Sequence, residues 1–189
     1  MGFYDSIENV ESYIKMAEGY DGREIIEVLR QYLKPGAAVL ELGMGPGVDL
    51  EILTETYTVT GSDYSEVFLE RYRQKHPDAD LIQLDAVSVD TERHFDCIYS
   101  NKVLHHLTAE ELAQSLLHQV SRLNPGGFLC HTFWAGDKEE EIQGIRFVYY
   151  AEETLEAMKP AGCETVVMAR YTEMDKDDSI HWLIQAKNK

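Results

Sequence analysis

The sequence predicts an α/β fold built around a mostly parallel β-sheet. Short apolar runs rich in β-forming residues alternate with segments in which apolar residues recur at helical spacing. A glycine cluster follows the first apolar run and leads into the next helical segment. This alternation implies βαβ units with right-handed crossovers. One domain over 1–189 accounts for the chain, and at that length folding can bury roughly 70 % of the unfolded surface.

The first predicted helix begins near Asp21. Asp21 and Glu24 have the spacing of a capping box, and the apolar residues of 25–33 share one helical face. Pro35 and Gly36 then end the helical pattern.

Strands and helices alternate after this helix. The helix from Thr108 has the clearest start, because Thr108 and Glu111 form a second capping box, and the Asn124-Pro125-Gly126-Gly127 sequence ends it. A helix is expected after each of the third and fourth strands. The predicted strands are 37–42, 57–63, 80–84, 95–100 and 128–133, and the helices between them include 48–53, 65–76 and 108–123.

The last part of the chain departs from this alternation. A helix is predicted over 151–159, followed by two strands over 163–171 and 180–186. The acidic connection 173–179 is too short for a crossover helix, so the two strands should pair antiparallel.

Composition and charge exclude several classes of protein. With 17 basic and 34 acidic residues, the formal net charge of −17 repels phosphate polymers and anionic membranes, so we expect neither as a partner. The first fifteen residues show no signal-peptide pattern and no run of about 18 apolar residues occurs, which predicts a cytoplasmic protein.

The cysteines have no CxxC spacing, which predicts buried thiols and no metal site. They are Cys97, Cys130 and Cys163.

The run Val39-Leu40-Glu41-Leu42-Gly43-Met44-Gly45-Pro46-Gly47 places an acidic residue near the end of the first strand and three glycines in the turn after it. Glycines here permit positive φ angles and let a ligand contact the backbone. The spacing is GxGxG, whereas a dinucleotide fingerprint has a third glycine where this chain has Val48. The alternative interpretation is a tight turn into a helix.

Polar residues also end the following strands. Asp63 follows the second strand, where a carboxylate can accept hydrogen bonds from ribose hydroxyls, and Tyr64 can lie against an adenine ring. Asp85 ends the third strand and Asn101 the fourth. A single residue of this kind is usually a helix cap or turn former. Four successive strands with such ends favour a ligand site at this edge of the sheet.

Together these residues resemble the class I S-adenosylmethionine-dependent methyltransferases, from about Asp21 to Ala186. The resemblance implies a Rossmann-like three-layer sandwich whose seven-stranded sheet has only its last strand antiparallel. It is closest to the small-molecule branch that carries an HHL sequence after the fourth strand. The motifs concerned are the 39–47 run, Asp63, Leu84-Asp85-Ala86, Phe95-Asp96-Cys97-Ile98-Tyr99-Ser100-Asn101-Lys102-Val103-Leu104-His105-His106-Leu107 and Leu123-Asn124-Pro125-Gly126-Gly127.

The resemblance implies S-adenosylmethionine as cofactor and S-adenosylhomocysteine as product. Gly43 and Gly45 would lie near the methionine part, Asp63 on the ribose and Asp85 on the adenine, while Glu41 organises the loop. This cofactor has no pyrophosphate, and residues 39–47 contain no basic residue. The predicted cofactor-binding residues are Tyr20, Glu41, Gly43, Met44, Gly45, Gly47, Asp63, Tyr64, Asp85, Ala86 and Asn101.

His105 and His106 are the candidates for a catalytic base, because they follow the fourth strand and imidazole titrates near neutral pH. The alternative is that one packs against the sheet edge while the other caps or lies exposed. His131 and His181 lie inside predicted strands and are expected to be structural.

Two segments remain to form a lid and to choose the acceptor. Residues 1–20 are the predicted lid, in which Tyr13 and Tyr20 either close over the cofactor or fasten the segment to the body. Residues 133–150 are a predicted substrate-side insertion, whose aromatic residues line an acceptor pocket or pack in the core. These aromatic residues are Phe133, Trp134, Phe147, Tyr149 and Tyr150.

The function predicted from the sequence is methyl transfer to a small molecule by a monomer or homodimer. Ser100-Asn101-Lys102-Val103 stands where amino-methylating nucleic-acid enzymes carry Asn-Pro-Pro-aromatic. The charge favours an uncharged or cationic acceptor, although Lys102 or Arg146 could meet an anionic one. Two alternatives stay open: a non-catalytic S-adenosylmethionine-binding protein, and a nicotinamide-dependent oxidoreductase.

Overall fold

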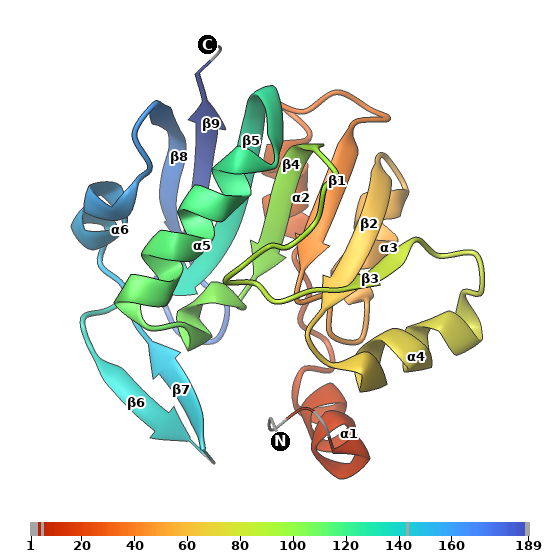
Figure 1. Cartoon of the computed structure of the whole chain (residues 1–189). Helices are drawn as coiled ribbons and strands as arrows, with labels where there is room; N and C mark the ends of the chain where they lie inside the picture. Colours follow the sequence, from red (N-terminus) through yellow and green to blue (C-terminus); the bar gives the residue numbers. More distant parts are fainter. Residues whose placement is uncertain (1–3, 5, 143, 188–189) are drawn as a thin grey trace.

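A computed structural model describes residues 4, 6–142 and 144–187, so parts of the predicted lid (1–3 and 5) and of the predicted insertion (143) lie outside the described residues. The described chain forms one seven-stranded sheet with helices on both faces, together with a separate two-stranded hairpin (Figure 1). The strands are β1 (Ala38–Leu42), β2 (Thr58–Asp63), β3 (Leu81–Gln83), β4 (Phe95–Asn101), β5 (Leu123–Trp134), β6 (Glu139–Ile142), β7 (Ile145–Val148), β8 (Cys163–Tyr171) and β9 (Ser179–Ala186).

The order in the large sheet is β3-β2-β1-β4-β5-β9-β8. Neighbours from β3 to β5 pair parallel, while β9 pairs antiparallel with both β5 and β8. The predicted fold class, with one antiparallel strand, is therefore confirmed. The helices are α1 (Ile7–Met16), α2 (Arg23–Leu29), α3 (Val48–Thr54), α4 (Glu66–Lys75), the 3-10 helix η2 (Leu104–His106), α5 (Ala109–Ser121) and α6 (Glu152–Met158).

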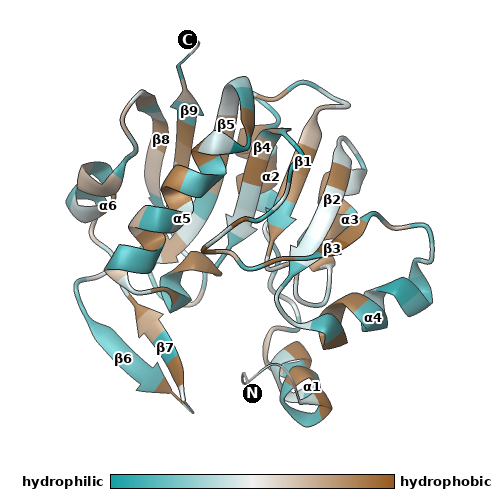
Figure 2. Ribbon diagram, in the orientation of Figure 1, coloured by the Kyte–Doolittle hydropathy of each residue, from teal (hydrophilic) through white to brown (hydrophobic). Residues whose placement is uncertain are grey.

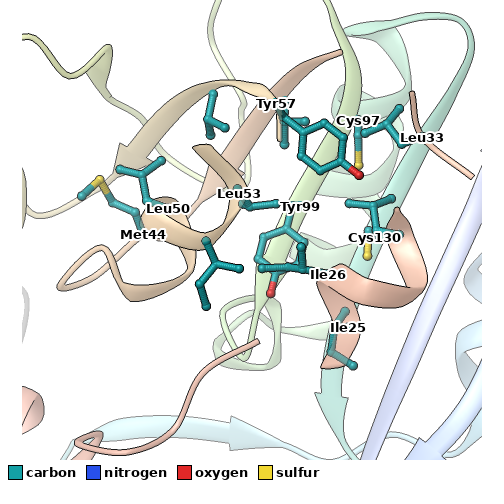
Figure 3. Close-up of a cluster of buried hydrophobic side chains, with 14 of the residues drawn as sticks. Ile25, Ile26, Leu33, Met44, Leu50, Leu53, Tyr57, Cys97, Tyr99 and Cys130 are labelled. Carbon is teal, nitrogen blue, oxygen red and sulfur yellow. The ribbon is translucent and has the colours of Figure 1, made fainter. Parts of the chain in front are cut away.

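Alternation along each strand divides the core between the two faces of the sheet. In β1, Val39 packs on the side of α2, α3 and α4, and Leu40 packs on the side of α5 and α6. Figure 3 shows the first of these clusters, in which Leu53 of α3 lies near Tyr99 of β4. Strands buried on both faces read as continuous apolar runs, which is why the sequence predicts them well.

The second predicted capping box is present. Thr108 Oγ1 accepts a hydrogen bond from the Glu111 amide at 3.1 Å, and the Thr108 amide donates to Glu111 Oε2 at 2.8 Å. These two bonds fix the start of α5, whose apolar stripe covers one face of the sheet.

The first predicted capping box is wrong. The N-cap of α2 is Gly22, whose amide donates to Asp49 Oδ1 at 2.6 Å, while Asp21 Oδ1 accepts from the Arg23 amide at 3.0 Å. The sequence suggested that a neighbouring residue caps this helix. Instead, the helix start is held by Asp49, which lies 27 positions away from Gly22 in the sequence.

The helix expected between the third and fourth strands is also absent from residues 84–94, which are described throughout. An Asp85-initiated turn replaces it: Asp85 Oδ1 accepts from the Val87 amide at 2.6 Å, and the Val89 amide donates to the Asp85 carbonyl at 2.9 Å. Too few apolar residues in this segment recur at helical spacing to stabilise a helix.

Helix α1, the 3-10 helix η2 and the β6–β7 hairpin were not predicted. Helix α1 lies in the predicted lid, and the hairpin lies in the predicted insertion. In Figure 2, β6 is mostly hydrophilic and β7 mostly hydrophobic, because three successive glutamates, 139–141, make up most of β6.

The three cysteines are buried free thiols, as predicted. Among the described residues, no group of three or more His, Cys, Asp or Glu side chains could hold a metal ion. In the same part of the chain, no helix is both long and apolar enough to span a bilayer.

His131 and His181 are buried inside the sheet, in agreement with their predicted structural role. Ser100 Oγ lies 2.8 Å from His131 Nδ1, and Cys130 Sγ lies 3.4 Å from His181 Nε2. Burial lowers the pKa of His131 to about 3 and that of His181 to about 4, so both rings are neutral in the folded protein.

These buried rings predict that the protein loses stability in mild acid. The unfolded chain takes up protons as the pH falls through about 6.5, whereas the folded chain keeps these rings neutral until the pH nears their depressed pKa values. We expect the free energy of unfolding to fall between about pH 6.5 and 4, with each histidine contributing at most about 1.4 kcal/mol per pH unit. Urea titrations at several pH values measure this slope.

Replacing one buried ring should reduce the slope. His131→Leu is expected to flatten the pH dependence, whatever its effect on absolute stability, while His94→Leu at an exposed position serves as the control. An identical slope in the wild type and His131→Leu would contradict the assignment.

Candidate functional site

A cavity of about 620 Å³ lies beyond the carboxyl ends of β1 and β4. Parallel α/β sheets bind ligands at this edge. Helix α1 and the β6–β7 hairpin lie on opposite sides of this edge in Figure 1, and both contribute residues to the cavity wall. The predicted site residues that line it are Tyr20, Glu41, Gly43, Met44, Gly45, Asn101, His105 and His106.

The glycine-rich loop between β1 and α3 approaches the cavity with its backbone. Gly43 and Gly45 have φ angles of +66° and +50°, in the region that favours glycine. A Cβ on Gly45 would meet only the Tyr13 ring, at 3.7 Å, so this part of the loop exposes its backbone to the cavity. Gly47 lies behind the loop as the N-cap of α3 and does not line the cavity.

Asp63 holds this loop from the end of β2. Its Oδ2 accepts from the Gly45 amide at 2.9 Å and its Oδ1 from the Ser65 amide at 2.8 Å. Burial raises the pKa of Asp63, and the backbone hydrogen bonds from Ser65, Gly45 and Tyr64 oppose that rise. Each carboxylate oxygen has two lone pairs, so Asp63 can fix the loop and still accept from a ligand hydroxyl.

Asp63 itself does not line the cavity, and the other predicted adenosine contacts also lie outside its lining. Tyr64 is 64 % exposed, and Asp85 is exposed with one oxygen bonded to the amide of Val87. The Ala86 carbonyl accepts from Ser115 Oγ at 2.5 Å. Their contact with a cofactor therefore stays a prediction.

The N-terminal segment covers the region around Asp63. The Tyr4 carbonyl accepts from Ser65 Oγ at 2.6 Å, and the Tyr13 ring packs against Tyr4 and Phe68 at centroid distances of 5.4 and 5.9 Å. Tyr13 thus fastens the segment to the body and also lines the cavity, while its closure over a cofactor stays a prediction.

Glu41 is an unpartnered acid in the cavity wall. It is 3 % exposed, and its Oε2 has no hydrogen-bond partner among the described residues. Burial, with the nearby Asp49 and Asp63, raises the pKa of Glu41 well above its ordinary value. A carboxyl group in this state is suited to a cationic ligand that restores its hydrogen bonds.

Asp49 joins three segments at the cavity and was missed by the sequence reasoning. Its carboxylate accepts from the Gly22 amide at 2.6 Å, from the Tyr99 hydroxyl at 2.7 Å and from Asn101 Nδ2 at 3.0 Å. Asp49 stands in the first turn of α3. Acidic residues are common there because they interact favourably with the helix dipole, so its position did not indicate a role in the site.

His105 and His106 form a hydrogen-bonded pair at the other side of the cavity. His106 Nδ1 lies 2.6 Å from the Arg146 carbonyl, which can only accept, so His106 Nδ1 carries the proton. His105 Nε2 lies 3.1 Å from His106 Nε2, and in the neutral pair His105 must be the donor. Burial lowers the pKa of both rings.

This pair ties η2 to the hairpin. The His105 ring also stacks on Phe147 of β7, at a centroid distance of 5.4 Å. His105 Nδ1 is buried and has no partner among the described residues. His105 therefore has the predicted packing role, here against the hairpin, and its neutral ring keeps a free acceptor at Nδ1. Its role as a catalytic base stays a prediction.

The predicted aromatic residues divide between cavity and core. Trp134 and Phe147 line the cavity, whereas Phe133 and Tyr150 are buried in the core. Tyr149 donates from its hydroxyl to Glu140 on the neighbouring strand at 2.5 Å.

The loop between β8 and β9 adds a wall that the sequence reasoning missed. Glu173 from this loop pairs with Lys102 Nζ at 2.7 Å, and Nζ lies 3.4 Å above the Trp134 ring. Lys102 follows the last residue of β4 and has a φ of +54°, a strained conformation for a non-glycine residue.

Comparison with known proteins agrees with this geometry. Residues 39–127, which include the glycine loop, Asp63, Asn101 and the His105-His106 pair, match a family model described as a methyltransferase domain. A crystal structure of an S-adenosylmethionine-dependent methyltransferase from Clostridium acetobutylicum ATCC 824 superposes with a TM-score of 0.77 at 13 % identity, covering 97 % of this chain and 100 % of that one. The fold is that of S-adenosylmethionine-dependent methyltransferases.

Other methyltransferases are similar over nearly all of the chain in structure, or over part of it in sequence. The N-methyltransferase NodS from Bradyrhizobium japonicum WM9, crystallised with S-adenosylhomocysteine, has a TM-score of 0.74 at 17 % identity, covering 98 % of this chain and 99 % of that one. An uncharacterised methyltransferase of Geobacillus sp. (strain WCH70) is 32 % identical over 131 residues, covering 63 % of this chain and 61 % of its own.

A tRNA (carboxymethyluridine(34)-5-O)-methyltransferase of Arabidopsis thaliana is 29 % identical over 110 residues, or 57 % of this chain and 26 % of its own. The match covers about a quarter to a third of the length of this and other curated relatives.

The family match and the structural neighbours support S-adenosylmethionine as the cofactor of this methyltransferase fold. The cavity residues fit it: the loop exposes its backbone, and Glu41 would offer an unpartnered carboxyl oxygen to a cofactor that carries a positively charged sulfur.

The Asp49 contact predicts that Gly22 cannot be enlarged without cost. A Cβ at this position would lie 2.1 Å from Tyr99 Oη and 2.5 Å from Asp49 Oδ2, although the backbone φ of −88° suits any residue. We expect Gly22→Ala to lower the free energy of unfolding by about 1–3 kcal/mol, a cost typical of overpacking. Urea denaturation measures it.

Tyr99→Phe provides the matched control, because it removes the hydroxyl oxygen that the new methyl group would meet. The Gly22→Ala, Tyr99→Phe double variant should lose less stability than the sum of the single variants. Strict additivity would contradict the steric explanation.

Proposed function

We propose that this chain transfers a methyl group from S-adenosylmethionine to a small-molecule acceptor. The observation that carries the proposal is one continuous cavity that is lined at one side by the glycine loop and Glu41 and at the other by Trp134 and Phe147. The first side suits a cationic cofactor, and the aromatic side suits the apolar part of an acceptor.

The cofactor, when bound, supplies a methyl group on a positively charged sulfur. The chain then has mainly to align the acceptor and exclude water, and orientation of this kind is worth roughly 7–11 kcal/mol. We assign the backbone of Gly43 and Gly45 to the methionine part, Asp63 to the ribose hydroxyls, and Asp85 with Tyr64 to the adenine. The N-terminal segment acts as a lid, because it contributes to the cavity wall and its Tyr4 carbonyl accepts a hydrogen bond from Ser65 Oγ, two residues after Asp63.

A small acceptor is favoured over a nucleic acid. The cavity volume lies within the range of small-molecule sites. The net charge of −17 opposes a polyanion, even though some relatives are tRNA methyltransferases. Trans-aconitate 2-methyltransferase of Methylobacterium nodulans, 32 % identical over 122 residues, is named for a small acceptor.

Calorimetric titration tests the cofactor. S-adenosylmethionine and S-adenosylhomocysteine should give heats of binding, and NAD should give none, because the glycine loop lacks the third glycine of a dinucleotide site. Binding of NAD alone would overturn the proposal in favour of an oxidoreductase.

Labelled methyl transfer tests the acceptor and separates the remaining alternatives. Transfer into a metabolite extract supports the proposal, whereas transfer only into bulk tRNA would overturn its acceptor class. Binding of the cofactor with no transfer into either pool would favour a non-catalytic cofactor-binding protein.

Asp63→Ala should weaken binding of S-adenosylhomocysteine by on the order of 1–3 kcal/mol, or about 5- to 150-fold, because ribose hydroxyls lose a charged acceptor and the loop loses its Gly45 contact. Calorimetry measures the affinity, and circular dichroism checks the fold. The control is Asp90→Ala, which removes an exposed carboxylate of the same charge. Equal affinities in both variants would show that Asp63 is only a turn residue.

A further inference from the structure

The charges in the cavity wall are unbalanced. Acidic side chains outnumber basic ones among the described lining residues, and the two histidines there are held neutral by burial. An anionic acceptor would therefore meet net repulsion, and a cationic one net attraction. Glu41 is left out of this balance because burial raises its pKa, which favours its neutral form. The remaining acids are Glu18, Asp21, Asp49 and Glu173, and the bases are Lys15 and Lys102.

The basic residue on the acceptor side is already paired. Lys102 Nζ contacts Glu173 Oε2 at 2.7 Å, donates to Ser179 Oγ at 2.6 Å and lies over the Trp134 ring. Arg146 does not line the cavity, and its Nε pairs with Glu139 at 3.1 Å. Neither cation proposed from the sequence for an anionic acceptor is left to bind one.

Glu173 is held by one oxygen and offers the other. Its Oε2 receives Lys102, the Tyr171 hydroxyl at 3.1 Å and Ser179 Oγ at 3.4 Å. None of these contacts involves Oε1. Glu173 lines the cavity, and 18 % of its side chain is exposed. Glu173 is thus fixed in place with an acceptor oxygen available to a ligand.

Apolar side chains surround the same part of the cavity and its mouth. Trp134 and Phe147 form the inner wall. Three exposed apolar side chains from three different segments form the rim, with exposures of 65 % for Met16, 49 % for Ile142 and 58 % for Met174. Exposed apolar side chains gathered at a cavity mouth indicate a ligand with an apolar body.

We propose that the acceptor is an amine carried on an apolar body, bound as its ammonium ion with Glu173 as the residue that recognises it. The proposal rests on the proposed function and names the substrate class for the same cavity. The apolar body would lie against Phe147, Met174 and the rest of the rim, with the amino group directed to Glu173 Oε1.

The reaction balances without a protein base. The ammonium ion gives one proton to water at the cavity mouth, and the freed lone pair on nitrogen forms the bond to the methyl carbon. The carbon–sulfur bond breaks with its electron pair staying on sulfur, so the products are a methylated ammonium ion and uncharged S-adenosylhomocysteine. The paired, neutral His105 and His106 are not required to accept the proton.

Binding of three matched probes tests the proposal on the unaltered protein saturated with S-adenosylhomocysteine. The probes are 2-phenylethylamine, 2-phenylethanol and 3-phenylpropanoate, which share a ring and a chain but differ in head-group charge. In calorimetric titrations at pH 7.5, the amine should bind at least tenfold more tightly than the alcohol, and the carboxylate should bind least tightly.

Glu173→Gln should weaken binding of the amine about tenfold and change binding of the alcohol less than twofold. The control is Glu141→Gln, an exposed residue of the hairpin outside the cavity, which should change neither. Each variant is first titrated with S-adenosylhomocysteine, so that loss of the cofactor site is measured separately.

Equal affinity for the amine and the alcohol, tighter binding of the carboxylate, or binding of none of the probes to the cofactor-saturated protein would overturn the amine proposal. Such results would leave the proposed function standing as long as S-adenosylhomocysteine binds. Failure of S-adenosylhomocysteine itself to bind the unaltered protein would overturn the proposed function instead.

Discussion

The Asp49 carboxylate is the contact on which the geometry of the cavity depends. It accepts hydrogen bonds from the start of α2 and from two residues of β4, and it stands at the beginning of α3 directly after the glycine loop. A buried carboxylate needs these donors, because an unsatisfied one would cost several kcal/mol. The start of α2, the loop and the sheet edge are therefore fixed relative to one another by one side chain.

Sequence periodicity predicted the parts of the fold that are stabilised by apolar burial. Strands such as β1 and β4 are buried on both faces, so their apolar runs are unmistakable, and the α5 capping box is local in sequence. The start of α2 was mispredicted because its partner, Asp49, is distant in the chain. Helix α1 and the hairpin were missed because they are stabilised by contacts with distant parts of the chain, such as Tyr13 with Phe68 and His106 with the Arg146 carbonyl, rather than by a strong local pattern.

The candidate site shows the same division. The glycine loop, Glu41 and Asn101 were found because parallel strands bring their carboxyl ends to one edge. Glu173 was not found, because it lies in an acidic connection whose composition is typical of an exposed turn. Only the pairing of β8 with β9 places that connection beside β4 and β5, and no local feature of the sequence predicts the contact between Glu173 and Lys102.

The hairpin has a consequence for how such a protein can change its acceptor. The β6–β7 pair is a sheet of its own, anchored to the body by contacts such as that between His106 and the Arg146 carbonyl. Residues added to or removed from its tip alter one wall of the cavity without shifting the register of the seven-stranded sheet. Acceptor choice and cofactor binding can therefore diverge independently, because the elements that govern them share a cavity but do not share hydrogen-bonded strands.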